Sequence, residues 1–367
     1  MEELLQGKNI KKDEDLSMNN KCKILLVTHK PCKIPESEYI VPIHAGRAVA
    51  LEKSKDGSIN QEDLDWLIEN TIGDNTGDNI SAKNRYYSEC SALYWAWKNY
   101  DELGNPDYIG LMHYRRHFIF DENYYAKKNK NLIESVYEVS FEKYINKKYF
   151  ERIGLNDQNI KNACNNSDII VSKDTHFELF GDINLRTDYE NNIEGTKVKD
   201  FDLMIETVLK FYPEYKPVID KYIYGYSKLS FSMFIMKKEL FFKYCDFLFK
   251  ILFEMEKYQN FDEYSLNGKR TPGYVAEILL TIFVWKLKEQ KDLRISQLGI
   301  TKVEYTYSDF EIQKILQNRC PSYLSYLLNK IKYILTFNTA KKQKRKTKYK
   351  KIRDEIRRYK NIKNIGE

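Results

Sequence analysis

The sequence has no long hydrophobic run, because polar or charged residues interrupt every window of the roughly 18 residues that a membrane-spanning helix needs. The first 20 residues are polar, of mixed charge and without the apolar core of a signal peptide. Glycine and proline are scarce, with 15 and eight residues among 367, which excludes a collagen-like or linker-type protein. Hydrophobic residues (42%) and charged residues (31%) instead predict a soluble globular chain with a substantial core.

Paired cysteines and clustered histidines are also missing. No CxxC pair or HExxH motif occurs, so the sequence favours neither a disulfide scaffold nor a zinc module. This cysteine usage is typical of a reducing cytoplasm, and we expect no tightly bound structural metal. The six cysteines are Cys22, Cys32, Cys90, Cys164, Cys245 and Cys320.

The net charge of +7 is concentrated at one end of the chain. Residues 341–367 hold 13 Lys/Arg against three Asp/Glu, whereas residues 1–340 hold 47 against 50. A near-neutral body argues against a nucleic-acid groove through the fold. The spacing of Leu324, Leu327, Leu328, Ile331, Ile334 and Leu335 predicts an amphipathic surface helix before the basic run. Together these features predict binding to an anionic membrane surface.

The body of the chain alternates strand and helix patterns. Short apolar runs predict strands at residues 23–28, 108–112, 167–174 and 230–237. Three- and four-residue apolar spacing predicts helices at about 81–99, 200–211, 238–257 and 273–288. This order is typical of an α/β fold with an open, largely parallel sheet covered by helices on both faces. In such folds ligands bind beyond the carboxyl ends of the strands.

The segment YIGLMHYRRHF, residues 108–118, is the most informative one. His113, Tyr114, Arg115 and Arg116 directly follow the second predicted strand, where an α/β sheet opens to ligands. Two adjacent guanidinium groups offer fixed forks of donors that suit phosphate. A salt-bridge cluster on the surface is the alternative interpretation, but the position favours a ligand site. His29, just beyond the first strand, lies in the same predicted region.

Metal-binding acidic pairs are not found after these strands. Nucleotide-sugar transferases of open α/β type commonly hold a divalent metal with an Asp-x-Asp pair at that position. Asp63 with Asp65 and Asp200 with Asp202 have the spacing, but they fall in helical patterns, where acidic residues complement the helix dipole. We therefore predict no metal ligands and no required cofactor, with guanidinium groups neutralising the leaving diphosphate. Mn²⁺ or Mg²⁺ remains an option.

Four segments resemble a known family: NISAKNRYYSECSALYWAWKN, the strand ending in HYRR, SFSMFIMKKELF, and RTPGYVAE. From about Lys23 to about Trp285 the chain is similar to bacterial capsular and exopolysaccharide glycosyltransferases, a family long catalogued as a domain of unknown function. The resemblance implies a cytoplasmic transferase with a GT-A-like fold that uses a nucleotide sugar, with UDP-galactofuranose or UDP-galactose among its donors. It also implies site roles for Asn84, Glu89, Trp95, Lys98, His113, Tyr114, Arg115, Arg116, Arg270, Gly273 and Glu277.

Two carboxylates in these motifs suit acid-base chemistry. Glu277 lies one turn into a predicted helix, a stable mount for a base that takes the proton of an acceptor hydroxyl, although N-terminal charge complementation explains it equally well. Glu89 either hydrogen-bonds the donor or pairs with Arg115 or Arg116. The stripe of Tyr87, Tyr94 and Trp97 favours core packing over a sugar platform. We assign Glu277 and His113 as catalytic residues, and His29, Asn84, Glu89, Lys98, Tyr114, Arg115, Arg116, Arg270 and Gly273 as substrate-binding residues.

These observations predict three regions. A polar segment (1–22) precedes a GT-A-like glycosyltransferase domain (23–300), and a basic helical extension (301–367) follows. We predict transfer of galactofuranose or galactose from a UDP-sugar to a lipid-linked or oligosaccharide acceptor of bacterial surface polysaccharide, at the inner face of the plasma membrane. The alternative from another class is a non-catalytic polyanion-binding or assembly protein. Nucleic acid is not an expected partner, because no recognised nucleic-acid-binding motif occurs.

Overall fold

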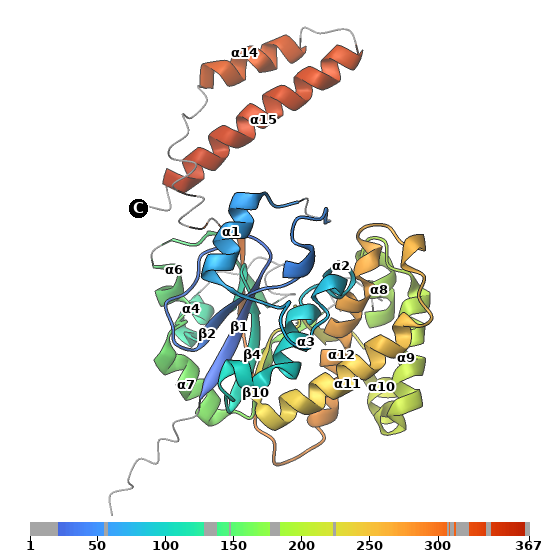
Figure 1. Ribbon diagram of the computed structural model, residues 1–367. Coiled ribbons are helices and arrows are strands. Elements are labelled where there is room, and N and C mark those ends of the chain that lie inside the picture. The colour runs from blue at the N-terminus through green and yellow to red at the C-terminus, as the bar shows by residue number, and fades with distance from the viewer. Residues whose placement is uncertain are drawn as a thin grey trace, which may run out of the picture.

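The computed structural model describes residues 21–54, 58–127, 138–146, 148–176, 184–222, 225–306, 308, 312, 323–334 and 339–363 (Figure 1). The described residues include only the last two of the predicted N-terminal segment 1–22, and they do not include Cys320 or Leu335. The strands are β1 (Cys22–Thr28), β2 (Ile40–His44), β3 (Ile72–Gly73), β4 (Tyr108–His113), β5 (Arg116–Phe118), β6 (Val139–Tyr144), β7 (Ile169–Ser172), β8 (Asp174–His176), β9 (Ser227–Leu229), β10 (Phe234–Lys237), β11 (Ile295–Leu298) and β12 (Ile300–Tyr305). The helices are α1 (Gln61–Asn70), α2 (Asn84–Tyr87), α3 (Cys90–Lys98), α4 (Glu122–Lys127), α6 (Tyr149–Arg152), α7 (Asp157–Asn166), α8 (Leu185–Asn192), α9 (Val198–Phe211), α10 (Lys216–Tyr222), α11 (Lys238–Glu256), α12 (Thr271–Leu287), α14 (Tyr323–Ile334) and α15 (Thr339–Lys363).

A mixed, largely parallel sheet forms the centre of the chain and confirms the predicted α/β class. Its main path runs in the order β11-β7-β10-β4-β1-β2-β3. Neighbours along this path are parallel except at β10, which is antiparallel to both β4 and β7. The strand predicted at 230–237 is therefore shorter than expected and reversed, because Phe231 and Ser232 adopt positive φ in a turn that precedes β10.

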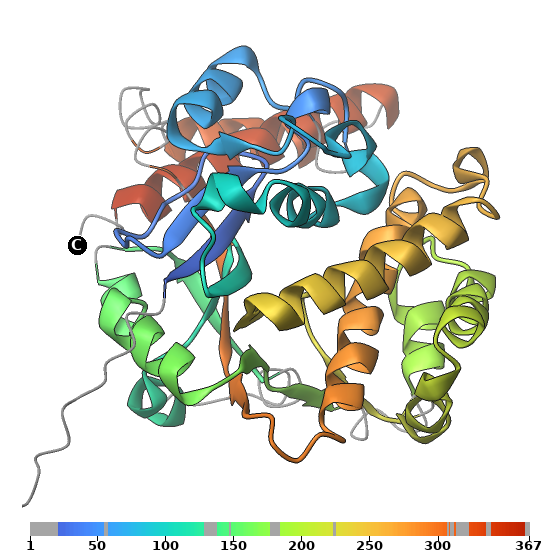
Figure 2. The same cartoon turned by 60° about the horizontal axis from the view of Figure 1, so that its bottom comes forward.

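The two faces of the sheet are covered by different helices. Leu25 and Val27 of β1 belong to the core shared with α3, α9, α11 and α12. Ile24 and Leu26 belong to the opposite core, which includes residues of α7. Figure 2 shows the sheet between green α7 on one side and yellow α11 and orange α12 on the other. Alternate side chains of a strand point to opposite faces, so the continuous apolar run of β1 serves both cores.

The helix predicted at 81–99 is divided in two by Ser88. This residue has φ 50° and ψ −130°, a conformation that ends α2 and allows α3 to begin two residues later. Its hydroxyl accepts a hydrogen bond from Arg270 Nε at 3.0 Å. A Cβ on Gly273 would lie 3.1 Å from Ser88 Oγ, so the break is packed closely against the start of α12. The sequence on both sides of Ser88 has helical periodicity, so it does not show that the helix must break here to pack against α12.

The predicted boundary at residue 300 coincides with the start of a strand. β12 pairs with β5 and β6 and thus belongs to the sheet, so the predicted extension 301–367 is not wholly helical. Farther along, α14 and α15 form a hairpin in which Tyr349 packs against Tyr326 and Tyr333, with ring centroids 6.3 and 5.1 Å away. Figure 1 shows this hairpin beyond the end of the sheet toward which β1 runs. None of the helices in the described ranges is both long and apolar enough to span a membrane.

Candidate functional site

A cleft of about 520 Å³ opens at the carboxyl ends of three parallel strands. Thr28 of β1, His44 of β2 and His113 of β4 line it, and the first turns of α12 line the other side. The break between α2 and α3 and the turn at Phe231 complete its wall. The cleft thus lies where the strand pattern predicts a ligand site.

Most of the predicted site residues meet in this cleft, and two do not line it. Lys98 lies at the end of α3, with its Nζ 3.7 Å from the centre of the Trp97 ring. Trp95 is buried and donates from Nε1 to Thr76 Oγ1 at 2.9 Å. The predicted residues that line the cleft are His29, Asn84, Glu89, His113, Tyr114, Arg115, Arg116, Arg270, Gly273 and Glu277.

The HYRR segment forms a tight hairpin at the cleft. His113 ends β4 and pairs with Arg116, the first residue of the antiparallel strand β5. Tyr114 lies in the turn, and its backbone N–H donates to Val27 O of β1 at 3.0 Å. The hairpin is thereby held against the neighbouring strand, and Arg115 and Arg116 are presented from a rigid part of the fold.

Arg116 is half-buried, and its guanidinium forms no ion pair with the described residues. Its guanidinium lies 4.5 Å from the centre of the Phe231 ring, and its Nε is buried with no hydrogen-bond partner. Burial and the adjacent Arg115 lower the pKa of Arg116. Burial, Arg116 and Arg115 also lower the pKa of Lys302. A half-buried cation without an ion-pair partner is costly, so this position favours an anionic ligand.

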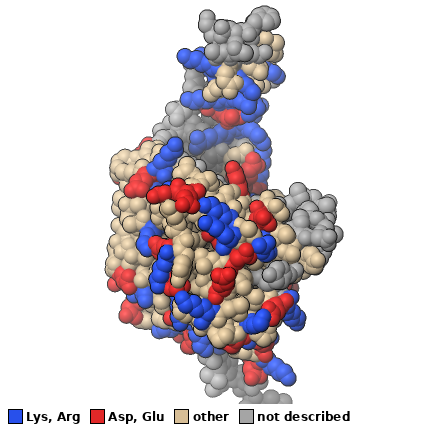
Figure 3. All heavy atoms as spheres, turned by 90° about the vertical axis from the view of Figure 1, so that its right-hand side faces the viewer, with Lys and Arg blue, Asp and Glu red and all other residues tan. Residues whose placement is uncertain are grey.

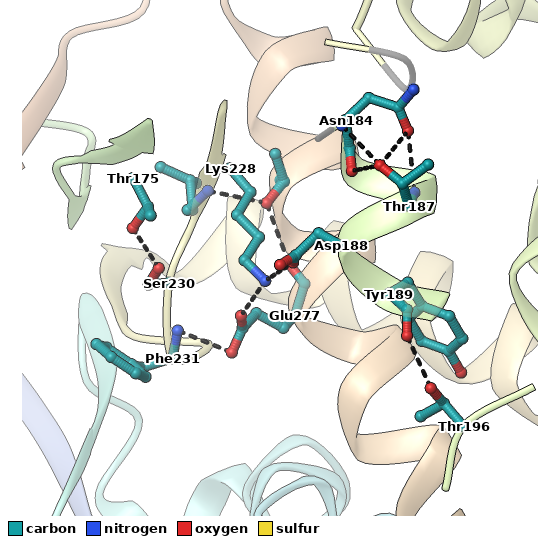
Figure 4. A network of polar contacts seen from close by, with 12 residues as sticks. Thr175, Asn184, Thr187, Asp188, Tyr189, Thr196, Lys228, Ser230, Phe231 and Glu277 are labelled. Atoms are coloured by element: carbon teal, nitrogen blue, oxygen red, sulfur yellow. Dashed lines mark hydrogen bonds and ion pairs between the residues drawn. The ribbon is translucent and has the colours of Figure 1, made fainter. Parts of the chain in front are cut away.

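Two carboxylates face these cations in the cleft. Glu277 of α12 accepts a hydrogen bond from the Phe231 N–H at 2.9 Å, and its Oε1 lies 3.4 Å from Lys228 Nζ (Figure 4). Glu89 precedes α3, and its charge acts with that of Glu277 on Arg116. Unlike Glu277, Glu89 forms no carboxylate ion pair with the described residues. The cleft therefore holds one carboxylate that is fixed on both oxygens and one that is less constrained.

His113 is neutral and binds the same backbone residue as Glu277. Its Nε2 donates to Phe231 O at 2.7 Å, since a carbonyl can only accept. Burial, with a contribution from Arg116, lowers the pKa of His113 to about 3. Burial likewise lowers the pKa of His44 and of His117 to about 3. This geometry favours a role for His113 in holding the Phe231 turn over its predicted catalytic role.

The three neutral histidines predict a loss of stability in mild acid. The folded chain keeps them unprotonated down to about pH 3, whereas the unfolded chain protonates them near pH 6.5. The unfolded state then binds more protons, so the free energy of unfolding should fall as pH drops from 7 toward 4. We expect an uptake of about 1.5 protons on unfolding at pH 6.5, measurable by calorimetry in two buffers. No uptake at this pH would contradict the assignment.

Asn84 and Gly273 shape the cleft through the backbone around Ser88. Asn84 Nδ2 donates to Ser88 O at 2.7 Å and to Ser91 Oγ at 2.9 Å, which stabilises the break between α2 and α3. Gly273 allows the close approach of α12 described above. The amide of Asn84 is thus engaged within the fold, and Arg270 presents its guanidinium beside the same break.

Sequence reasoning missed several residues that build or line the cleft. Asp74 is fully buried and accepts hydrogen bonds from Gly46 N at 2.7 Å, Arg47 N at 3.1 Å and Ser91 Oγ at 2.6 Å, which ties the loop after β2 to α3. No local pattern marks such a carboxylate. Lys53, Arg85 and Lys269 also line the cleft. Arg85 is next to Asn84 in the sequence and Lys269 is next to Arg270, so their positions beside predicted site residues could have identified them.

The two Asp-x-Asp pairs in the predicted helices do not line the cleft. Asp63 and Asp65 lie on α1, behind the capping residue Asn60. Asp200 is buried and accepts a hydrogen bond from Tyr264, and Asp202 pairs with Arg186 at 2.9 Å. Across the residues that the structure describes, no group of three His, Cys, Asp or Glu side chains has the arrangement of a metal site.

Comparisons with known proteins give a family and a structural relative. Residues 23–290 match the family described as a domain of unknown function (DUF4422). A solved apo structure of the bifunctional glycosyltransferase WbbM is similar to this chain at 31% sequence identity and a TM-score of 0.67. The similarity covers 79% of this chain and 46% of the WbbM chain, so this chain spans less than half of that protein. No curated protein matches the chain.

Proposed function

Because the chain belongs to the DUF4422 family and resembles part of a bifunctional glycosyltransferase, we propose that it is itself a glycosyltransferase with a GT-A-like fold. Its donor is a UDP-sugar, with galactofuranose or galactose as the transferred group. Its acceptor is a lipid-linked or oligosaccharide precursor of bacterial surface polysaccharide. The family resemblance supports these choices of donor and acceptor, and the cleft supplies the chemistry that they require.

The unpaired guanidinium of Arg116 is the observation that carries this proposal. A nucleoside diphosphate brings negative charge, and charge-assisted hydrogen bonds from Arg115 and Arg116 suit its phosphate oxygens. The same groups stabilise the diphosphate as it leaves with the glycosidic bond electrons, so the reaction needs no divalent metal. Glu277 accepts the proton of the attacking acceptor hydroxyl.

A screen of nucleotide sugars tests this function. A ligand that binds the folded chain raises its melting temperature, and UDP-sugars should do so more than other nucleotide sugars, with EDTA present. The enzyme should hydrolyse the donor found in this way slowly when no acceptor is present. With an acceptor present, it should transfer the sugar of that donor to the acceptor. Equal stabilisation by unrelated polyanions, without hydrolysis or transfer of any donor, would instead support a polyanion-binding protein.

The hairpin of α14 and α15 supplies a peripheral membrane contact in this proposal. Its tyrosines pack inside the hairpin, whereas Leu327, Leu328, Ile331 and Ile334 of α14 remain 36–58% exposed. Figure 3 shows Lys and Arg gathered on the hairpin, above a body in which both signs of charge alternate. An exposed apolar stripe beside basic residues suits the inner leaflet better than nucleic acid.

Substitution of the apolar stripe should release the chain from membranes. Leu328→Asp with Ile331→Asp puts two carboxylates on the exposed stripe without altering the tyrosine contacts within the hairpin. We expect sedimentation with vesicles of anionic lipid at about 0.15 M salt to fall at least tenfold, and truncation after Arg319 to abolish it. Transfer to a soluble acceptor should persist. Equal vesicle binding by parent and variants would refute the hairpin as the membrane contact, and retention on DNA instead would favour a nucleic-acid partner.

A further inference from the structure

Lys228 lies behind the proposed catalytic carboxylate. Its Nζ is 2.9 Å from Asp188 Oδ2 on α8 and 3.4 Å from Glu277 Oε1 on α12 (Figure 4). The side chain of Lys228 is 13% exposed and that of Asp188 is 8% exposed, whereas Glu277 is 26% exposed and lines the cleft. The three groups thus form a chain from the interior of the protein to the cleft.

The charge of Lys228 is maintained by its two partners. Burial alone would lower its pKa, but Glu277 and Asp188 outweigh burial and raise the pKa above the ordinary value. The ammonium group therefore stays protonated between the two carboxylates. The charges of Arg116 and Glu277 also interact, Arg115, Lys269 and Arg270 line the same cleft, and His113 beside Arg116 is neutral.

Glu277 is held on both oxygens by this arrangement. Oε2 accepts from the Phe231 N–H, and Oε1 faces Lys228. Each carboxylate oxygen has more than one acceptor site, so these contacts orient the group and leave capacity for a substrate hydroxyl. Catalytic bases are commonly oriented by a third group in this way.

We propose that Lys228 is a positioning residue that orients Glu277 for proton abstraction, and that Asp188 balances the charge of Lys228. This inference rests on the proposed function, because it assigns the base of the same transfer reaction. Lys228 does not contact substrate in this proposal and acts through Glu277.

The pH dependence of turnover tests this role with two variants that should shift the acidic limb of kcat in opposite directions. Lys228→Met leaves Glu277 and Asp188 without the ammonium between them, so Glu277 should bind its proton more tightly and the acidic limb of kcat should move up by about one pH unit or more. Asp188→Asn removes one of the two carboxylates that neutralise Lys228, so Glu277 remains its charged partner. The acidic limb of kcat should then move to lower pH. Lys228→Arg should restore the parent profile. KM for the donor should stay within about twofold throughout.

Several outcomes would overturn the inference. A kcat that is lowered equally at every pH in both Lys228→Met and Asp188→Asn would indicate a purely structural role. Lys210→Met serves as a control, because it removes a different ion pair, with Glu254 at 2.6 Å, from residues that do not line the cleft. Its profile should match that of the parent chain. A parent chain that transfers no sugar would refute the proposed function itself, whereas a parent that transfers sugar with unshifted variant profiles would refute only the role of Lys228.

Discussion

Replacement of Arg116 by methionine is expected to weaken UDP binding by at least tenfold while the fold survives. Each charge-assisted hydrogen bond contributes about 1.5 to 3 kcal/mol, which corresponds to a loss of roughly tenfold to a hundredfold in affinity. The double variant Arg115→Ala with Arg116→Met should lose about a hundredfold or more. Titration calorimetry with UDP in the presence of EDTA measures both losses.

The stability of the same variant without ligand gives a second, independent result. Arg116 is half-buried, its buried Nε lacks a hydrogen-bond partner, and its guanidinium lies over Phe231. Methionine keeps an apolar stem against that ring and removes the cost of the unpaired charge. We therefore expect the melting temperature of the unliganded variant to equal or exceed that of the parent. An unchanged or higher melting temperature would indicate that the charge of Arg116 serves ligand binding and does not stabilise the unliganded fold.

A matched arginine provides the control for this experiment. Arg186 forms an ion pair with Asp202 at 2.9 Å and does not line the cleft. Arg186→Met should leave UDP affinity unchanged. If the folded double variant at Arg115 and Arg116 binds UDP as the parent does, the diphosphate does not bind to these two arginines. That result would contradict the main reason for placing the donor in this cleft.

Substitution of Glu277 by glutamine is expected to lower turnover by about 10² to 10⁴, the usual contribution of a general base. Glutamine keeps the size of the side chain and an oxygen that accepts from the Phe231 N–H, but it takes no proton. UDP affinity should therefore stay within about twofold of the parent value. Turnover measured at saturating donor separates this loss of chemistry from a loss of binding.

Glu89→Gln distinguishes the two carboxylates of the cleft. Glu89 also acts on the charge of Arg116, but it lacks the fixed contacts that orient Glu277. We expect its substitution to change turnover by less than about tenfold. The reverse order of effects would make Glu89 the base and would leave Glu277 as a support for the Phe231 turn.

Much of the fold follows from local patterns in the sequence. The apolar runs at 23–28 and 108–112 predict β1 and β4, because a strand buried on both faces has no polar alternation. The stop at Tyr212 and Pro213 predicts the end of α9. HYRR is recognisable as a candidate site segment because its two adjacent arginines follow a buried strand, at the edge where an α/β sheet binds ligands. These features depend on neighbours along the chain, which the sequence displays directly.

Other features depend on partners distant in the chain, and only the tertiary structure decided them. Periodicity does not specify strand direction, so the reversal of β10 follows only from its antiparallel pairing with β4 and β7. The positive φ of Phe231 belongs to a turn whose backbone binds the distant residues His113 and Glu277. The apolar spacing around Ser88 predicts one continuous helix. The helix is interrupted at Ser88, where Arg270 and Gly273, which are distant along the chain, pack against this residue.

The charge states in the cleft were decided in the same way. Arg116 and Lys228 are both basic residues on short strands. The sequence marks Arg116 as a candidate phosphate ligand and does not mark Lys228, but it shows the partners of neither charge. Among the described residues Arg116 has no ion-pair partner, and its buried Nε has no hydrogen-bond partner, which favours an anionic ligand, whereas Asp188 and Glu277 neutralise Lys228. The sequence by itself determined which residue types were available near the sheet edge. The fold determined which of their charges remain unpaired, because electrostatic pairing depends on distance and burial in three dimensions.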